Sequence, residues 1–172
     1  MGSNCAVGVD VDFYWAGCPS EFLEDHIEQA KDALFAALGE RRQLLWNPHA
    51  EAMVKAEIKD RLRQAARGQL KPVDEVKSLR GGRDHLFEIR WQGIAITERL
   101  EDGTHRHVKT NLRLIFAEPP ELSVAAVGLV AVEKPEGEEG KALQDAAINE
   151  AERRYHAGLP RRWGLNLRRQ RS

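Results

Sequence analysis

The spacing of apolar residues changes from a helical to an alternating period near Pro72. Before that point apolar residues recur every three or four positions, as in Leu23, Ile27 and Leu34, which is the period of an amphipathic helix. After it, polar and apolar residues alternate from Leu86 onwards, which is the period of a half-buried strand. A chain with this order is expected to pack helices from its first half against an antiparallel sheet from its second half.

Turn and cap residues divide these regions into elements. We predict a strand over 11–15, a helix from an N-cap at Ser20 to Gly39, and a second helix from Asn47-Pro48 to Gly68. Further strands are predicted from residue 86, over 94–97, 112–116 and 122–132, with a hairpin turn at Asp102-Gly103. The expected inner face of the second helix is Met53, Ala56, Leu62 and Ala65, and that of a last helix over 141–156 is Leu143, Ala147, Ala151 and Tyr155.

The predicted fold class is therefore α+β. Two N-terminal helices pack on a mostly antiparallel sheet of four or more strands, and a C-terminal helix closes the fold. The length of 172 residues suits one domain, residues 1–172. No run approaches the ~18 apolar residues of a membrane helix, and the first residues lack a signal-peptide pattern, so we expect a cytoplasmic protein without membrane contact. Cys5 and Cys18 lie in no metal or redox motif and are expected to be reduced.

Charge is distributed unevenly although the formal net charge is only −1. Residues 153–172 contain seven arginines and no acid, and the arginine-rich tail begins at about residue 157. A cationic tail attracts phosphate groups or an acidic protein face. The alternative is a solvated, disordered C-terminus, and the sequence leaves both open.

Several familiar chemistries have no motif here. The chain lacks the glycine-rich loops of phosphate and dinucleotide sites and the G-x-S-x-G elbow of hydrolases. His105 and His107 would share one face of a strand, but no third ligand follows at metal-site spacing. We therefore expect no cofactor and no metal.

Two segments of the sheet region resemble a known family. V-K-S-L-R-G-G-R-D-H-L-F-E-I-R-W, which starts at Val76, resembles the part of RelE-like toxins where a basic loop enters a strand. N-L-R-L-I-F-A-E-P, which starts at Asn111, resembles the next strand of that family. A strand, then Glu133-Lys134, then a helix containing E-A-E-R-R-Y follow in the order of the phage-related, HigB-like branch of the RelE/ParE superfamily. The likeness in layout covers roughly residues 11–157.

This resemblance implies a toxin of a toxin–antitoxin system that cleaves messenger RNA on the ribosome through the 2′-hydroxyl. The implied partners are a cognate antitoxin and ribosome-bound mRNA. Such cleavage needs cations beside the phosphate, a role that suits the planar, permanently charged arginine fork. The implied catalytic residues are Arg80, Arg113 and Lys134, and the implied RNA-binding residues are Lys77, Arg83 and Arg90. We expect Arg80 and Arg113 to point to one open surface of the sheet, so that Arg113→Ala leaves the fold intact.

Three features depart from the family pattern and keep a second function open. The chain is nearly neutral, Gln92–Asn111 is a long insertion, and an acid precedes Lys134. The alternative is a non-enzymatic binder of the same fold, such as a ParE-like gyrase inhibitor or an inactive regulatory or phage-related protein. An active nuclease also needs a proton acceptor, for which the candidates are His85, His105 and Tyr155.

Overall fold

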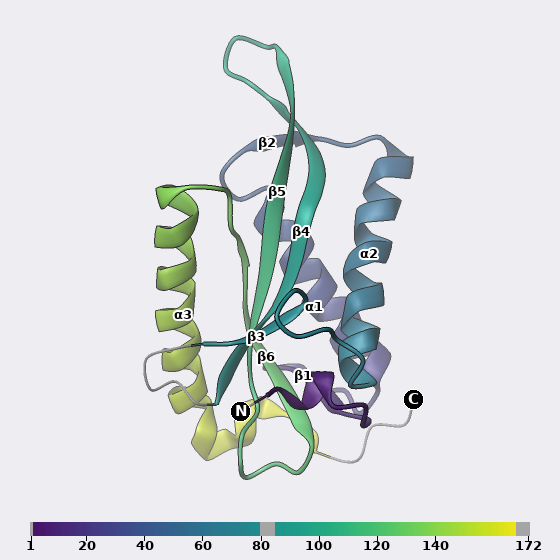
Figure 1. Ribbon diagram of the computed structural model, residues 1–172, viewed down its shortest axis with the longest axis vertical. Coiled ribbons are helices and arrows are strands. Elements are labelled where there is room, and N and C mark those ends of the chain that lie inside the picture. Colours follow the sequence, from purple (N-terminus) through teal and green to yellow (C-terminus); the bar gives the residue numbers. More distant parts are fainter. Residues whose placement is uncertain (1, 80–84, 168–172) are drawn as a thin grey trace.

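The computed structural model describes residues 2–79 and 85–167 and shows an α+β fold (Figure 1). These residues form three α-helices, six strands and two short 3-10 helices, η1 and η2. Their order is η1 (Asn4–Ala6), β1 (Asp12–Trp15), α1 (Leu23–Leu38), β2 (Gln43–Leu45), α2 (Pro48–Ala66), β3 (Val76–Ser78), β4 (Leu86–Arg99), β5 (His105–Ala117), β6 (Ala125–Glu133), α3 (Glu138–Gly158) and η2 (Leu159–Gly164).

The sheet is mixed. Its strands follow the order β1-β6-β5-β4-β2, and β3 pairs with another part of β4. β1 and β6 run parallel, whereas β2, β3 and β5 each run antiparallel to β4, as do β5 and β6 to each other. The predicted α+β class and the C-terminal helix are confirmed, but the sheet is mixed and does not match the antiparallel arrangement that was expected. The parallel β1–β6 pair and the three-residue strands β2 and β3 were not predicted, because such short pairings leave no periodic pattern in a sequence.

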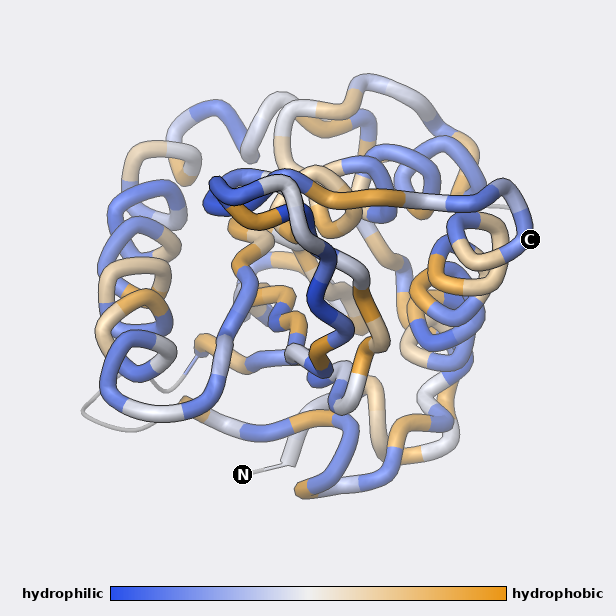
Figure 2. Tube along the Cα trace, turned by 90° about the horizontal axis from the view of Figure 1, so that it is seen from above, coloured by the Kyte–Doolittle hydropathy of each residue, from blue (hydrophilic) through white to orange (hydrophobic). Residues whose placement is uncertain are grey.

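Helices cover both faces of the sheet. Buried residues of α1 and α2, such as Leu34 and Ile58, form one core with Trp91 and Leu114 of the strands. Buried residues of α3 form a second core on the opposite face, which includes Ala151. Figure 2 looks along the molecule from above, with α3 and α2 on opposite sides. Alternate residues of each strand therefore belong to different cores, and this assigns each polar side chain of β4 and β5 to one face.

Several predicted boundaries and faces need correction. The N-cap position of α1 is Phe22 and not the predicted Ser20, and no side-chain hydrogen bond caps the helix; the Ser20 hydroxyl accepts the Phe22 backbone N–H just before it. On α2 the side chain of Met53 is 60% exposed and Ala56 is exposed too, whereas Val54 and Ile58 are buried with the predicted Leu62 and Ala65. The strand predicted over 122–132 runs over 125–133, and α3 starts at Glu138, three residues earlier than expected. The caps at Asn47 and Gly39 are as predicted.

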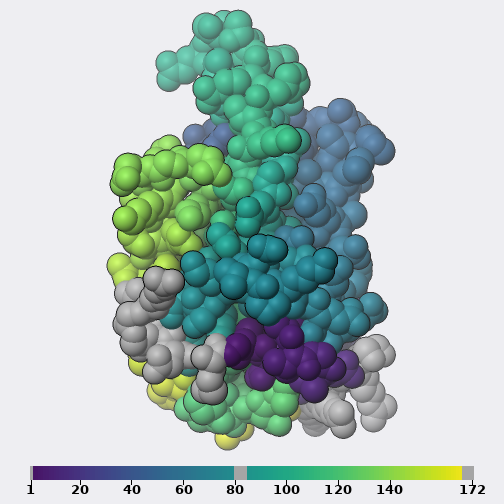
Figure 3. Space-filling view, viewed as in Figure 1, coloured from purple at the N-terminus to yellow at the C-terminus, as the bar shows by residue number. Residues whose placement is uncertain are grey.

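Residues 92–111 extend the β4–β5 hairpin well beyond the helices (Figure 1). Its strands pair from Arg99 with His105 down to Ile94 with Thr110, and a bulge follows between Trp91 and Ile94. Figure 3 shows the hairpin as a column projecting from the body. We call residues 95–109 the arm.

The α1 face of the hairpin carries a buried ion network. Arg42, in the connection after α1, contacts the carboxylates of Glu98 at 3.3 Å and Glu133 at 2.6 Å. Thr110 donates a second hydrogen bond to Glu133, at 2.9 Å. Because Glu98 and Glu133 are almost fully buried, this network anchors the hairpin to the helical layer.

None of the helices formed by the described residues is long and apolar enough to cross a membrane.

Candidate anion-binding pocket

A pocket of about 330 Å³ lies on the α3 face, beside the start of that helix. Four cationic side chains line it, contributed by two strands, a loop and a helix. The full lining is Arg90 and Gln92 of β4, Asn111 and Arg113 of β5, Lys134, Pro135, Glu136 and Gly137 of the β6–α3 loop, and Lys141 of α3.

Two arginines meet in this pocket because β4 and β5 place them opposite each other in register. Arg90 pairs with Arg113, so both side chains leave the sheet on the same face. The buried carboxylate of Glu88 lies beside both, with its Oε1 3.5 Å from Arg90 Nε and 3.8 Å from Arg113 Nε. Gln144 of α3 donates to the other oxygen of Glu88 at 2.5 Å. Glu88 thus offsets part of the repulsion between the two guanidinium groups.

Arg113 is buried, with only 2% of its surface exposed, so the prediction of an open-surface arginine is wrong. Its Nη1 donates to the backbone oxygens of Leu112 at 2.9 Å and Trp91 at 3.3 Å. Burial lowers the pKa of the Arg113 guanidinium, which Glu88 opposes and Arg90 reinforces. An arginine nevertheless keeps its charge in a protein. Its buried Nε has no hydrogen-bond partner and faces Glu88 Oε1 at 3.8 Å.

The β6–α3 loop is fixed in place by Asn111. The Asn111 amide donates to the Lys134 oxygen and to Glu136 Oε1, each at 3.0 Å, and accepts the Gly93 N–H of the bulge at 3.2 Å. At Gly140 a β-carbon would lie 1.6 Å from the Pro135 oxygen, so only glycine permits the loop to pack on the first turn of α3. Lys134, at the start of this loop, and Lys141, in the first turn of α3, both line the pocket. Neither ammonium group has an ion-pair partner among the described residues.

The charge balance of the pocket favours an anion. Four cations face two carboxylates, Glu88 and Glu136. The N-terminus of α3, capped by Gly137, adds the positive end of a helix dipole. Acids also occupy that first turn, and one of them, Glu139, is paired with Arg41 outside the lining. The remaining positive potential suits a phosphate group.

Three of the six predicted site residues, Arg90, Arg113 and Lys134, come together here. Lys77 lies on β3 opposite Glu88 in register and does not line the pocket. The predictions for Arg80 and Arg83 lie outside the described residues. Sequence reasoning missed Glu88, Asn111 and Lys141, although the position of Lys141 directly after Gly140 at a predicted helix start was a usable signal.

The predicted proton acceptors lie elsewhere. His85 is five residues before Arg90, about 16 Å along an extended strand, and its ring stacks on Tyr155 at 4.1 Å between centroids. His105 lies near the far end of the arm, where β5 begins. Of the acids, Glu136 lines the pocket directly. Within the described part of the chain, no three His, Cys, Asp or Glu residues are grouped as metal ligands would be.

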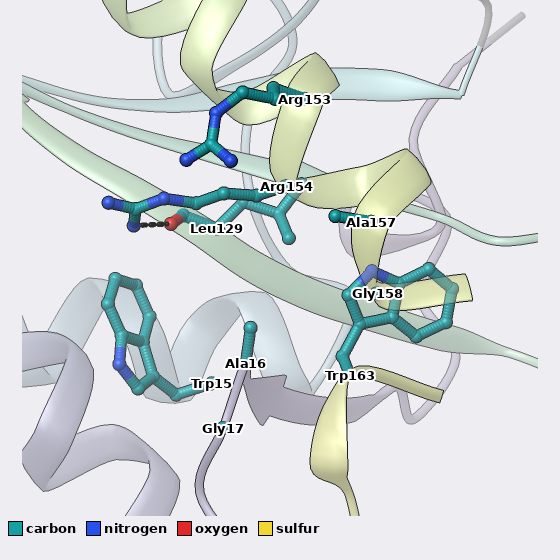
Figure 4. A pocket seen from close by; sticks show the side chains of 9 residues that line it. All are labelled: Trp15, Ala16, Gly17, Leu129, Arg153, Arg154, Ala157, Gly158 and Trp163. Atoms are coloured by element: carbon teal, nitrogen blue, oxygen red, sulfur yellow. Dashed lines mark hydrogen bonds between the residues drawn. The ribbon is translucent and has the colours of Figure 1, made fainter. Parts of the chain in front are cut away.

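A second pocket, of about 360 Å³, lies near the other end of α3 (Figure 4). Trp15 and Trp163 lie on opposite sides of it, and Arg153 and Arg154 project over it. Both arginines contact Glu150, which lowers the pKa of that carboxylate to about 2, and Arg154 also donates to the Leu129 oxygen at 2.7 Å. Because these guanidinium groups are already paired, this pocket is a weaker anion site than the first.

No protein-family profile, curated protein or solved structure matches this chain.

Proposed function

We propose that this chain is an RNA-cleaving toxin of the RelE-like kind, which cuts messenger RNA on the ribosome and is neutralised by a cognate antitoxin. The observation that carries the proposal is the convergence of Arg90, Arg113 and Lys134 on one pocket. These three residues were selected by resemblance alone and are spread over 44 positions of the sequence. Lys141 of α3 lines the same pocket.

In the proposed reaction the pocket holds the phosphate at the cleavage point. The 2′-oxygen attacks phosphorus and its proton passes to an acceptor, for which Glu136 is the acid in the lining. The bond from phosphorus to the 5′-oxygen breaks, and an ammonium group of Lys134 or Lys141 supplies the proton to that leaving oxygen. The products are a 2′,3′-cyclic phosphate and a 5′-hydroxyl. Arg113 stabilises the charge on the phosphate oxygens from the side of the pocket formed by the sheet.

A binder without cleavage, such as a gyrase inhibitor or a regulatory protein, is the second candidate. It is favoured by the position of His85 and Tyr155 outside the pocket. The hydrogen bond from Asn111 to Glu136 also favours it, because Oε1 of that carboxylate is already engaged in holding the loop. A binder uses the same cations for an anionic partner but needs no proton acceptor.

Induced expression separates these functions. We expect the unmutated chain to arrest growth and to produce new mRNA 5′ ends in primer extension. Lys134→Ala/Lys141→Ala should abolish both, since loss of one preorganised donor typically costs about 10²–10³ in rate. The matched control is Arg67→Ala/Lys71→Ala, which removes two exposed cations that do not line the pocket. Growth arrest without new RNA ends would favour the binder, and a harmless unmutated chain would refute the toxin proposal.

A further inference from the structure

The arm has two chemically different faces. On the α1 face, Ile96 and Val108 pack against the core, and Arg106 donates to Glu98 at 2.6 Å. On the α3 face the register pairs Arg99 with His105, Thr97 with His107 and Ala95 with Lys109. Every basic side chain on this second face is exposed: Arg99, His105, His107 and Lys109.

This basic face leads directly into the anion-binding pocket. His105, His107 and Lys109 are followed on the same side of β5 by Asn111 and Arg113, which line the pocket. Successive members are about 6.8 Å apart along the strand, although the twist of a two-stranded ribbon winds the row around the arm. No acid interrupts it on β5 between His105 and Arg113. The acids nearest the arm tip, Glu101 and Asp102, lie in the turn.

We propose that the arm is a guide for single-stranded RNA, and that it holds the nucleotides flanking the phosphate in the pocket. The inference rests on the proposed function, since it extends the same site. Arg99, at the far end of the arm on β4, and Lys109, nearer the pocket on β5, contact two phosphates of the strand. The imidazole rings of His105 and His107 stack on unpaired bases, as flat side chains do in single-strand recognition. Thr97 Oγ1 fixes the ring of His107 through a 2.8 Å contact with Nδ1.

Charge complementarity is the reason to choose RNA as the occupant. The whole chain carries a formal charge of −1, yet the row from His105 to Arg113 contains only basic and neutral side chains. The face is also open, because α3 begins beside the pocket and the arm projects past it (Figure 1). The arm protrudes from the body, and Arg42 anchors it on its α1 face. Its α3 face is exposed and basic, which suits binding along a polyanion.

The test measures binding of a fluorescent RNA strand by anisotropy over a series of KCl concentrations. Every 2′-oxygen of the strand is methylated, so that it cannot be cleaved through its 2′-hydroxyl. Arg99→Ala/Lys109→Ala should weaken binding and reduce the slope of log K against log salt by about 1.4, or 0.7 for each lost phosphate contact. His105→Ala/His107→Ala should leave the slope unchanged and weaken binding by about 5-fold or more per ring. Arg67→Ala/Lys71→Ala is the control and should match the unmutated chain.

An unchanged slope and affinity in Arg99→Ala/Lys109→Ala, with circular dichroism showing an intact fold, would overturn the inference. This is also the result expected if the arm binds an acidic protein instead of RNA. The inference and the proposed function fail separately. If RNA binding depends on the arm but no RNA is cleaved, only the nuclease is refuted. If RNA is cleaved but binding does not depend on the arm, only the guide is refuted. Absence of RNA binding by the unmutated chain refutes the guide, whereas the nuclease is judged separately by the RNA ends formed on the ribosome.

Discussion

Replacing Arg113 by methionine should destabilise the fold, contrary to what an exposed strand arginine would do. Methionine keeps much of the apolar stem but removes the donors to the Leu112 and Trp91 oxygens. It also removes a cation beside Glu88, whose side chain is 2% exposed. A buried carboxylate is then left with fewer partners, and this is the main cost of breaking a buried pair.

The size of the effect follows from what remains around Glu88. Breaking a buried ion pair by removing one partner costs about 3–5 kcal/mol. Arg90 Nε at 3.5 Å and Gln144 at 2.5 Å still face the carboxylate, so we expect the lower end, about 3 kcal/mol. Since a domain has about 5–15 kcal/mol in total, the variant should still fold. Its urea midpoint should fall by roughly 1.5 M for an m-value of about 2 kcal/mol/M.

A double-mutant cycle followed by urea denaturation and circular dichroism checks this reasoning. Glu88→Gln/Arg113→Met should cost less than the two single substitutions together, with a coupling of about 1–3 kcal/mol. Arg153→Met serves as the control on an exposed arginine and should leave the midpoint unchanged. A loss below about 1 kcal/mol for Arg113→Met, or strict additivity, would show that Glu88 and Arg113 do not act as a buried pair.

Two further predictions concern stability. Arg42→Ala should cost about 3 kcal/mol, because buried Glu133 and Glu98 lose a cation while Thr110 and Arg106 still donate to them. The more exposed pair lost in Arg41→Ala should cost under about 1 kcal/mol. Similar urea midpoints for both variants would contradict the anchoring role of Arg42. Burial lowers the pKa of His26 below its ordinary 6.5, so the folded state holds this ring neutral while the unfolded chain takes up a proton. The contribution of His26 to the free energy of unfolding should therefore be full above pH 6.5 and fall below it by at most about 1.4 kcal/mol per pH unit. Between pH 7.5 and 5.5, the free energy of unfolding should fall less for His26→Gln than for the unmutated chain. An equal loss would exclude His26 as a source.

The elements with long periodic patterns could be predicted from the sequence. The helical spacing around Leu34, the caps at Gly39 and Asn47, and the alternation from Leu86 all correspond to elements of the structure. The inner face of α2 could not be predicted correctly, because Met53 and Val54 are both apolar and a one-residue rotation decides which is buried. The parallel β1–β6 pair was also missed, since pairing partners more than 100 residues apart leave no local signal.

The candidate site was predictable only in part. Resemblance selected Arg90, Arg113 and Lys134, and the fold brings them to one pocket. It did not show that Arg113 is buried, because its partners are brought beside it only by the fold: Glu88 and the Trp91 oxygen, more than 20 residues away in the sequence. The importance of Asn111 was hidden for a similar reason: its partners, the bulge at Gly93 and the loop at Lys134, meet only in three dimensions.

The central claim is that RNA is cut at a phosphate held by the pocket cations, and the products of the reaction test it most directly. Purified protein is added to ribosomes carrying an end-labelled messenger RNA, and the new ends are identified by mass spectrometry. The account predicts a 5′-hydroxyl and a 2′,3′-cyclic phosphate, formed at least about 100-fold more slowly by Lys134→Ala/Lys141→Ala and at an unchanged rate by Arg67→Ala/Lys71→Ala. Intact RNA with the unmutated protein, or equal rates for all three proteins, would contradict it.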